Sequence, residues 1–161
     1  MAEQINNSPS DSPTNQMLQL VTFGVGDCQL AVGIENVQEI NRQLELTPVP
    51  GAPSEIRGVI NLRGDVVTVL DLHYLLGLSR RNRSRTSRNL ILNINGERVG
   101  VLVDHVSDIL AISPDDISRR PPNLNHVDRK FMRGVHIREE GVVVILDSQA
   151  LASAAEPALV N

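Results

Sequence analysis

The chain is dominated by short runs of Val, Ile and Leu, each of strand length and each bounded by Gly, Pro, Asn, Asp or Ser. Such runs are typical of strands, and their close spacing favours a sandwich or barrel over alternating strands and helices. Only 2% of the residues are aromatic, so aliphatic side chains must fill the interior. Strands are expected at residues 18–23, 28–33, 58–63, 65–71, 89–94, 97–104, 108–113, 131–137 and 142–147. The sequence therefore predicts an all-β fold with two halves of about five strands each.

The turns between these runs predict hairpins. Asn95-Gly96 is the pair that best tolerates the positive φ angles of a type I′ turn. Further turns are expected over 24–27, at Gly64 and at Glu140-Gly141. The strands GVINLR and RGVHI look like loose counterparts, although no fixed-period repeat is evident.

Short helices are expected beside the strands. Ile34, Val37 and Ile40 recur at three-residue spacing, which predicts a helix that packs one side on the barrel. Glu39 then lies off that apolar row. Prolines make residues 48–53 a stiff, extended connector. Further helical segments are expected over 72–76 and 148–155.

The ends of the chain differ from its middle. Residues 1–16 are rich in Asn, Ser, Pro and Gln and lack apolar periodicity, which predicts a disordered tail. The folded domain is expected over 17–153, followed by a C-terminal tail over 154–161.

Charge and cysteine content indicate a cytosolic protein with protein partners. Fifteen Lys and Arg against 19 Asp and Glu give a net charge of -4, which does not attract nucleic acid or anionic membrane. Cys28 is the single cysteine, so no internal disulfide can form. No secretion signal opens the chain, and no apolar run reaches the roughly 18 residues that cross a bilayer.

The sequence contains no recognisable catalytic or metal-binding motif. It lacks a nucleophile elbow, a phosphate-binding loop and a dinucleotide fingerprint. Its histidines have no second ligand at helical spacing, so neither a metal nor another cofactor is expected. Cys28 is expected to be a buried, inert thiol. These observations predict a protein that is not an enzyme. The histidines are His73, His105, His126 and His136.

A dense basic run between two predicted strands leaves two interpretations open. It is either a solvated loop or a contact for an acidic partner or nucleic acid, although it lacks the interleaved aromatics that stack on bases. A small β-barrel that binds nucleic acid is therefore the alternative function. The run consists of Arg80, Arg81, Arg83, Arg85 and Arg88.

Two oppositely charged residues stand out in apolar surroundings. Glu39 precedes the proline connector, and Arg63 ends the strand VINLR. An arginine can bind a carboxylate through two parallel hydrogen bonds. The pair is either a partner-binding feature or a surface salt bridge worth less than about 1 kcal/mol.

Three stretches of the sequence resemble the CheW family of chemotaxis coupling proteins. They are V-x-E-I-N-R at 37–42, the segment 47–72, and V-G-V-L-V-D-H-V-S-D-I-L at 99–110. The most specific part is P-x-x-x-x-G-V-x-N-L-R-G at 53–64. The resemblance extends from about Leu18 to about Leu151.

This resemblance implies two SH3-like five-stranded β-barrels that share a hydrophobic core. It also implies a non-catalytic adaptor that binds the regulatory domain of a CheA-type histidine kinase and the cytoplasmic tip of chemoreceptors. Such an adaptor works in the cytoplasm at the receptor array, without inserting into the membrane, and is expected to be a monomer when free.

By position in the family's motifs, the resemblance also implies the partner-binding residues. They are Val37, Glu39, Arg57, Gly58, Asn61, Arg63, Gly64, Val106 and Ile109. Two residues depart from the family pattern: His105 stands where many relatives have Gly, and Thr68 stands where Pro is frequent. These departures leave open which receptor or kinase is served.

Overall fold

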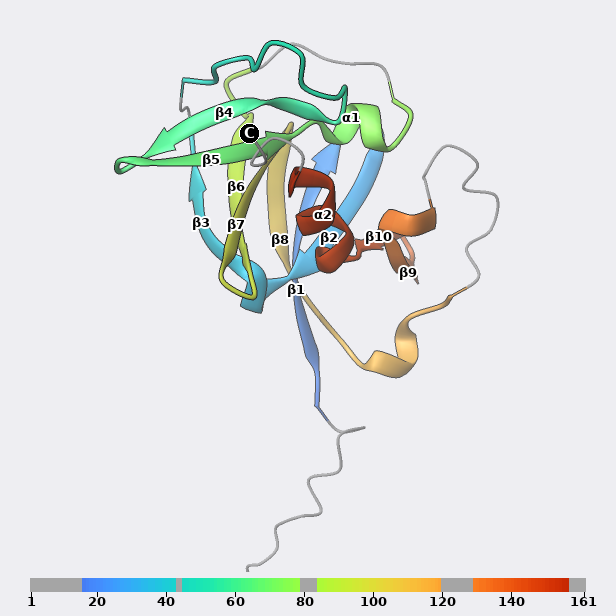
Figure 1. Ribbon diagram of the computed structural model, residues 1–161. Helices are drawn as coiled ribbons and strands as arrows, with labels where there is room; N and C mark the ends of the chain where they lie inside the picture. The colour runs from blue at the N-terminus through green and yellow to red at the C-terminus, as the bar shows by residue number, and fades with distance from the viewer. Residues whose placement is uncertain (1–15, 43–44, 79–83, 120–128, 157–161) are drawn as a thin grey trace, which may run out of the picture.

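The structure, a computed structural model, describes residues 16–42, 45–78, 84–119 and 129–156 (Figure 1). Ten strands within these ranges form two five-stranded sheets, which confirms the all-β fold with short helices. All but the last residue of the predicted tail over 1–16 lies outside the described residues, as do His126 and Arg80, Arg81 and Arg83 of the basic run.

The first sheet has the strand order β8-β1-β2-β10-β9 and combines both ends of the described chain. Every neighbouring pair is antiparallel except β2 and β10, which run parallel. Its strands are β1 (Leu18–Val25), β2 (Cys28–Gly33), β8 (His105–Ile112), β9 (Met132–Arg138) and β10 (Gly141–Leu146).

The second sheet has the order β3-β6-β7-β5-β4 and is built from the segment between β2 and β8. Here β5 and β7 are the parallel pair. Its strands are β3 (Val37–Asn41), β4 (Ile56–Leu62), β5 (Asp65–Leu70), β6 (Arg88–Ile94) and β7 (Glu97–Val103). Each sheet is curved and SH3-like, but its two edge strands do not pair, so backbone hydrogen bonds close neither barrel.

The two sheets repeat one plan. In each, an antiparallel hairpin (β1-β2 or β6-β7) pairs in parallel with a second hairpin (β9-β10 or β4-β5). Val59 of β4 bridges Thr47, and Val135 of β9 bridges Ser118 in the same way. The offset between Val59 and Val135 is 76 residues (135 minus 59), which confirms that GVINLR and RGVHI are counterparts.

The helix prediction for residues 34–40 is wrong in its second part. A 3₁₀ turn, η3 (Ile34–Asn36), is followed directly by strand β3. Ile34 and Ile40 are 36% and 43% exposed, and Val37 alone of the three packs against the core. Val37 and Ile40 lie in β3, and their β-branched side chains suit a strand once β6 provides backbone partners.

Turn positions differ slightly from those predicted. The β1-β2 turn is confined to Gly26-Asp27, and the β9-β10 turn lies at Glu139-Glu140, one residue earlier than expected. The hairpin turn at Asn95-Gly96 is confirmed, with φ angles of 54° and 87°.

Both second hairpins lead into helices that are capped alike. Asp71 caps α1 (Leu72–Leu75) by accepting from the Tyr74 N–H, and Asp147 caps α2 (Ser148–Ala155) by accepting from the Ala150 N–H. The remaining helices are the 3₁₀ turns η4 (Pro114–Asp116) and η5 (Arg129–Phe131). Ala155 at the end of α2 is 3% exposed, so packed structure continues through that residue.

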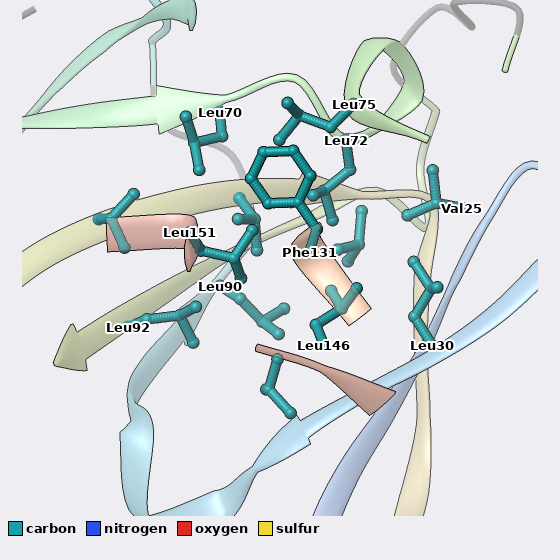
Figure 2. Packing of buried hydrophobic residues seen from close by; sticks show 14 of the residues in the cluster. Val25, Leu30, Leu70, Leu72, Leu75, Leu90, Leu92, Phe131, Leu146 and Leu151 are labelled. Atoms are coloured by element: carbon teal, nitrogen blue, oxygen red, sulfur yellow. The ribbon is translucent and has the colours of Figure 1, made fainter. Parts of the chain in front are cut away.

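One hydrophobic core joins the two sheets. Figure 2 shows Leu30 of the first sheet, Leu90 of the second and Leu151 of α2 directed into the same cluster. Helix α2 lies between the sheets and contacts β5, β6 and β7 (Figure 1). Burying a leucine side chain contributes about 1.5–3 kcal/mol. The sheets are therefore lobes of one folding unit. None of the described helices has the length and apolar character needed to cross a membrane.

Candidate partner-binding site

The site is built on the turn that joins β4 to β5. Arg63 and Gly64 form this turn with φ angles of 53° and 91°, and the Asn61 side chain accepts a hydrogen bond of 2.8 Å from the Gly64 N–H. Asn95-Gly96 forms the β6-β7 turn with nearly the same angles. Asparagine tolerates the left-handed region well, whereas arginine does not. Turn geometry alone therefore does not explain arginine at position 63.

Arg63 forms a bidentate ion pair with Glu39. Arg63 Nη1 lies 2.7 Å from Glu39 Oε2, and Arg63 Nη2 lies 2.9 Å from Glu39 Oε1. The hydrogen bond from Arg63 lowers the pKa of Glu39, and the same contact raises the pKa of Arg63. The arginine side chain is 71% exposed and that of the glutamate 19%.

This ion pair connects the two edges of the second sheet. Glu39 belongs to the edge strand β3, and Arg63 directly follows the other edge strand, β4. The side chains thus close the curved sheet where its backbone does not. A second ion pair, between Arg98 of β7 and Asp65 of β5, lies on the same sheet. The structure thus brings Glu39 and Arg63 into direct contact as an ion pair at the surface.

Gly58 and Arg57 lie in β4 at a bulge opposite β5. Gly58 is buried, and a Cβ atom there would come within 2.5 Å of the Thr47 carbonyl oxygen. Gly134 of β9 has the same relation to Ser118, whose carbonyl oxygen would be 2.9 Å from an added Cβ. Both glycines therefore make room for a crossing backbone, while Arg57 is half-buried beside Gly58.

The remaining predicted residues divide between the two sheets. Val37 of β3 and Val106 of β8 are half-buried and pack against the core, and Ile109 of β8 is 58% exposed. The structure thus brings Glu39, Asn61, Arg63 and Gly64 together at the β4-β5 turn. It places Val106 and Ile109 on an edge of the other sheet.

Two exposed apolar residues of the second sheet were not among the predicted site residues. Ile40 follows Glu39 on β3, and Val66 of β5 is 63% exposed, opposite Asn61. Val66 belongs to the near-continuous apolar run over 65–71, so the sequence did not distinguish it from the buried residues of that run. Burial along β5 does not alternate, because Val67, Thr68 and the two residues after them are all buried, so no local pattern in the sequence marks Val66 as exposed.

Of the described histidines, His73 lies in the interior beside two carboxylates. His73 is buried, with Nε2 3.5 Å from Asp104 Oδ1 and Nδ1 3.9 Å from Asp71 Oδ1. No group of three or more potential metal ligands occurs within the described ranges. Cys28 is half-buried beside the core, and burial raises the pKa of its thiol, with Asp27 adding to this effect.

Comparison with known proteins identifies the family. Residues 19–156 match the CheW-like domain. The chain is 36% identical over 134 residues to a chemotaxis protein CheW from Rhizobium meliloti (strain 1021), covering 83% of this chain and 86% of that protein. It is 40% identical over 100 residues to protein FrzA of Myxococcus xanthus, covering 62% of each.

A solved structure agrees with this match in three dimensions. The scaffolding protein TtCheW from Thermoanaerobacter tengcongensis superposes with a TM-score of 0.75 at 29% sequence identity. The superposition covers 82% of this chain and 90% of that chain. With matching sequence, matching fold and a family match over most of its length, the chain belongs to the CheW family.

Proposed function

We propose that this chain is a non-catalytic coupling adaptor that links chemoreceptors to a CheA-type histidine kinase in a chemosensory array. Its family and the names of its relatives, chemotaxis protein CheW and scaffolding protein TtCheW, support this role. Within this role, the chain's direct partners are the regulatory domain of the kinase and the cytoplasmic tip of the receptor. We place the chain in the cytoplasm at the receptor array, as a monomer when free.

The observation that carries the proposal for the site is the ion pair between Glu39 and Arg63. It is held on a tight turn at the rim of a sheet whose strands β3 and β5 also expose the apolar residues Ile40 and Val66. An interface of this kind combines an apolar contact with a positioned arginine, a residue type enriched at interface hot spots. The other proposed contacts are Val37, Arg57, Gly58, Asn61, Gly64, Val106 and Ile109.

An adaptor of this kind transmits signals through relative affinities. A receptor state that binds the adaptor-kinase complex more tightly shifts the kinase toward the conformation favoured in that complex. The chain therefore needs two partner surfaces and a rigid body between them. The core shared by the two sheets provides such a body.

The test is calorimetric titration of the chain against the cognate kinase regulatory domain and a receptor tip fragment. The wild type should bind at least one fragment with a micromolar Kd, which corresponds to about 8 kcal/mol. Arg63→Ala should weaken binding about tenfold while circular dichroism shows an intact fold.

Arg98→Ala is the matched control, because Arg98 is also an ion-paired arginine of the second sheet. This variant should bind like the wild type. Absence of wild-type binding to both fragments would refute the coupling function. Equal weakening by the two variants would mean that the loss of binding is not specific to Arg63, and would contradict its assignment to the interface.

A further inference from the structure

Because the two sheets share one strand arrangement, the first sheet has a position equivalent to each position of the proposed site in the second sheet. Val106 pairs with Phe23 as Val37 pairs with Leu92, with an offset of 69 residues (106 minus 37; 92 minus 23). Both strand pairs contain a register shift next to this position. The counterpart of Glu39 in the first sheet is therefore Asp108 on β8.

The two surfaces carry different charges. In the second sheet, Arg63 and Arg98 each neutralise a carboxylate. The residues at the corresponding positions of the first sheet are Glu139 (63 plus 76) and Gln29 (98 minus 69). Gln29 donates to Ser107 Oγ at 3.0 Å instead of pairing with an acid. Neither Arg63 nor Arg98 thus has an arginine at its equivalent position in the first sheet. The carboxylate of Glu39, by contrast, has an equivalent in Asp108.

A groove of about 650 Å³ lies at this place in the first sheet. It is lined by the β1-β2 turn, β2, β8 and the β9-β10 hairpin. Three of its lining residues are acidic and one is basic, and that basic residue, Arg138, lies 3.6 Å from Glu140. Asp108 Oδ1 accepts a hydrogen bond of 2.6 Å from Thr22 Oγ1, which fixes the carboxylate at the rim. The lining residues are Asp27, Gln29, Ser107, Asp108, Arg138, Glu140, Gly141, Val142 and Val143.

We infer that this groove binds an arginine side chain of a partner protein, which takes the place that the chain fills with its own Arg63 in the second sheet. The groove carries an excess of negative charge, and a guanidinium offers planar donors for the Asp108 carboxylate. The Ser107 hydroxyl and the Gln29 side-chain oxygen supply further acceptors. The inference rests on the proposed function only for the identity of the protein that supplies the arginine.

The first experiment needs no partner. N-acetyl-arginine amide is titrated into the ¹⁵N-labelled full chain, with N-acetyl-norleucine amide as the uncharged probe. The arginine probe should shift the amide signals of Gln29, Ser107 and Asp108, and added salt should weaken the effect. Equal shifts from both probes, or no shifts at these residues, would overturn the inference.

Two variants test the geometry of the groove. Asp108→Asn removes the charge, and Glu139→Arg restores the arginine that the second sheet has at Arg63. Each should weaken arginine-probe binding about two- to fivefold, within the range expected for exposed charge pairs. Glu97→Arg makes the same charge change at an exposed residue of the β6-β7 hairpin and should bind like the wild type. Unchanged binding by both groove variants would contradict the inference.

The same variants separate this inference from the coupling function. If the wild type binds a kinase or receptor fragment, Asp108→Asn and Glu139→Arg should each weaken that binding about tenfold. Wild-type binding that neither variant alters would remove the groove from the interface but leave the adaptor function standing. If the wild type binds neither fragment, the coupling function fails, and the arginine-probe titration alone decides whether the groove binds arginine.

Discussion

Arg63 occupies a turn position that its own backbone preferences disfavour. At the equivalent step of the β6-β7 hairpin, the chain uses Asn95, which suits a positive φ. Residues held in sparsely populated backbone regions gather at functional sites, where another requirement outweighs local strain. For Arg63 that requirement is the contact with Glu39 and, in our account, with a partner.

Arg63→Asn should therefore separate stability from function. Asparagine relieves the strain of the left-handed conformation, so the urea midpoint of the variant should equal or exceed that of the wild type. Its binding to the partner fragments should fall as it does for Arg63→Ala. A variant that is both less stable and fully able to bind would show that the arginine serves the fold alone.

The ion pair also predicts a pH dependence. Arg63 lowers the pKa of Glu39 below its ordinary value of 4.5, so the pair's stabilisation is present above that value and is lost as the pH falls through the lowered pKa. Between about pH 6 and about pH 3, the urea midpoint of Glu39→Gln should fall less than that of the wild type. Parallel curves for the two proteins would contradict this assignment.

Among the secondary-structure elements, those defined by local turn residues could be predicted best from the sequence. The β6-β7 hairpin, both second hairpins and the range of α2 were predictable, because Asn-Gly, Gly64 and the capping aspartates act locally. Residues 34–40 were not, since three-residue spacing of β-branched residues fits a helix until β6 offers hydrogen-bond partners. Likewise, Glu39 and Arg63 stood out in the sequence, whereas Asp108 did not, because its relation to Glu39 exists only in the paired strands.

Gly58 and Gly134, which occupy equivalent positions in the two sheets, each leave room for a crossing backbone segment, and Gly134 allows this to be tested. In Gly134→Ala the new Cβ would lie 2.5 Å from Ile117 Cγ2 and 2.9 Å from the Ser118 oxygen, so the crossing segment must move. The free energy of unfolding should fall by about 1–3 kcal/mol, as for other overpacked sites, and urea denaturation measures it.

Gly33→Ala is the control for this experiment. The three atoms nearest its new Cβ all belong to the flexible side chain of Glu35, so its stability should change by less than about 0.5 kcal/mol. Equal stability of Gly134→Ala and the wild type would mean that the crossing segment adapts freely.

At the scale of the whole molecule, the shared core makes two sheets into one rigid unit. The second sheet is inserted between strands β2 and β8 of the first, and Leu151 of α2 belongs to the core cluster that both sheets share (Figure 1). A rigid body of this kind keeps the surfaces around Arg63 and Asp108 at a fixed separation. That property suits a protein that must hold two partners at once.

Leu151→Ala tests whether the two sheets unfold as one cooperative unit. Leu151 is fully buried in the cluster that contains residues of both sheets, so the truncation should cost about 2–5 kcal/mol. Unfolding should remain a single transition, with Tyr74 fluorescence and far-ultraviolet circular dichroism giving coincident curves. Two separated transitions would show that the sheets fold independently.

The proposed adaptor couples receptor state to kinase activity. The most direct measurement is autophosphorylation of the cognate kinase with receptor fragments assembled on vesicles, with and without the chain. Receptors should change the kinase rate only when the chain is present, and Arg63→Ala should reduce this effect while Arg98→Ala should not. A kinase rate that responds equally to receptors with and without the chain would contradict the account.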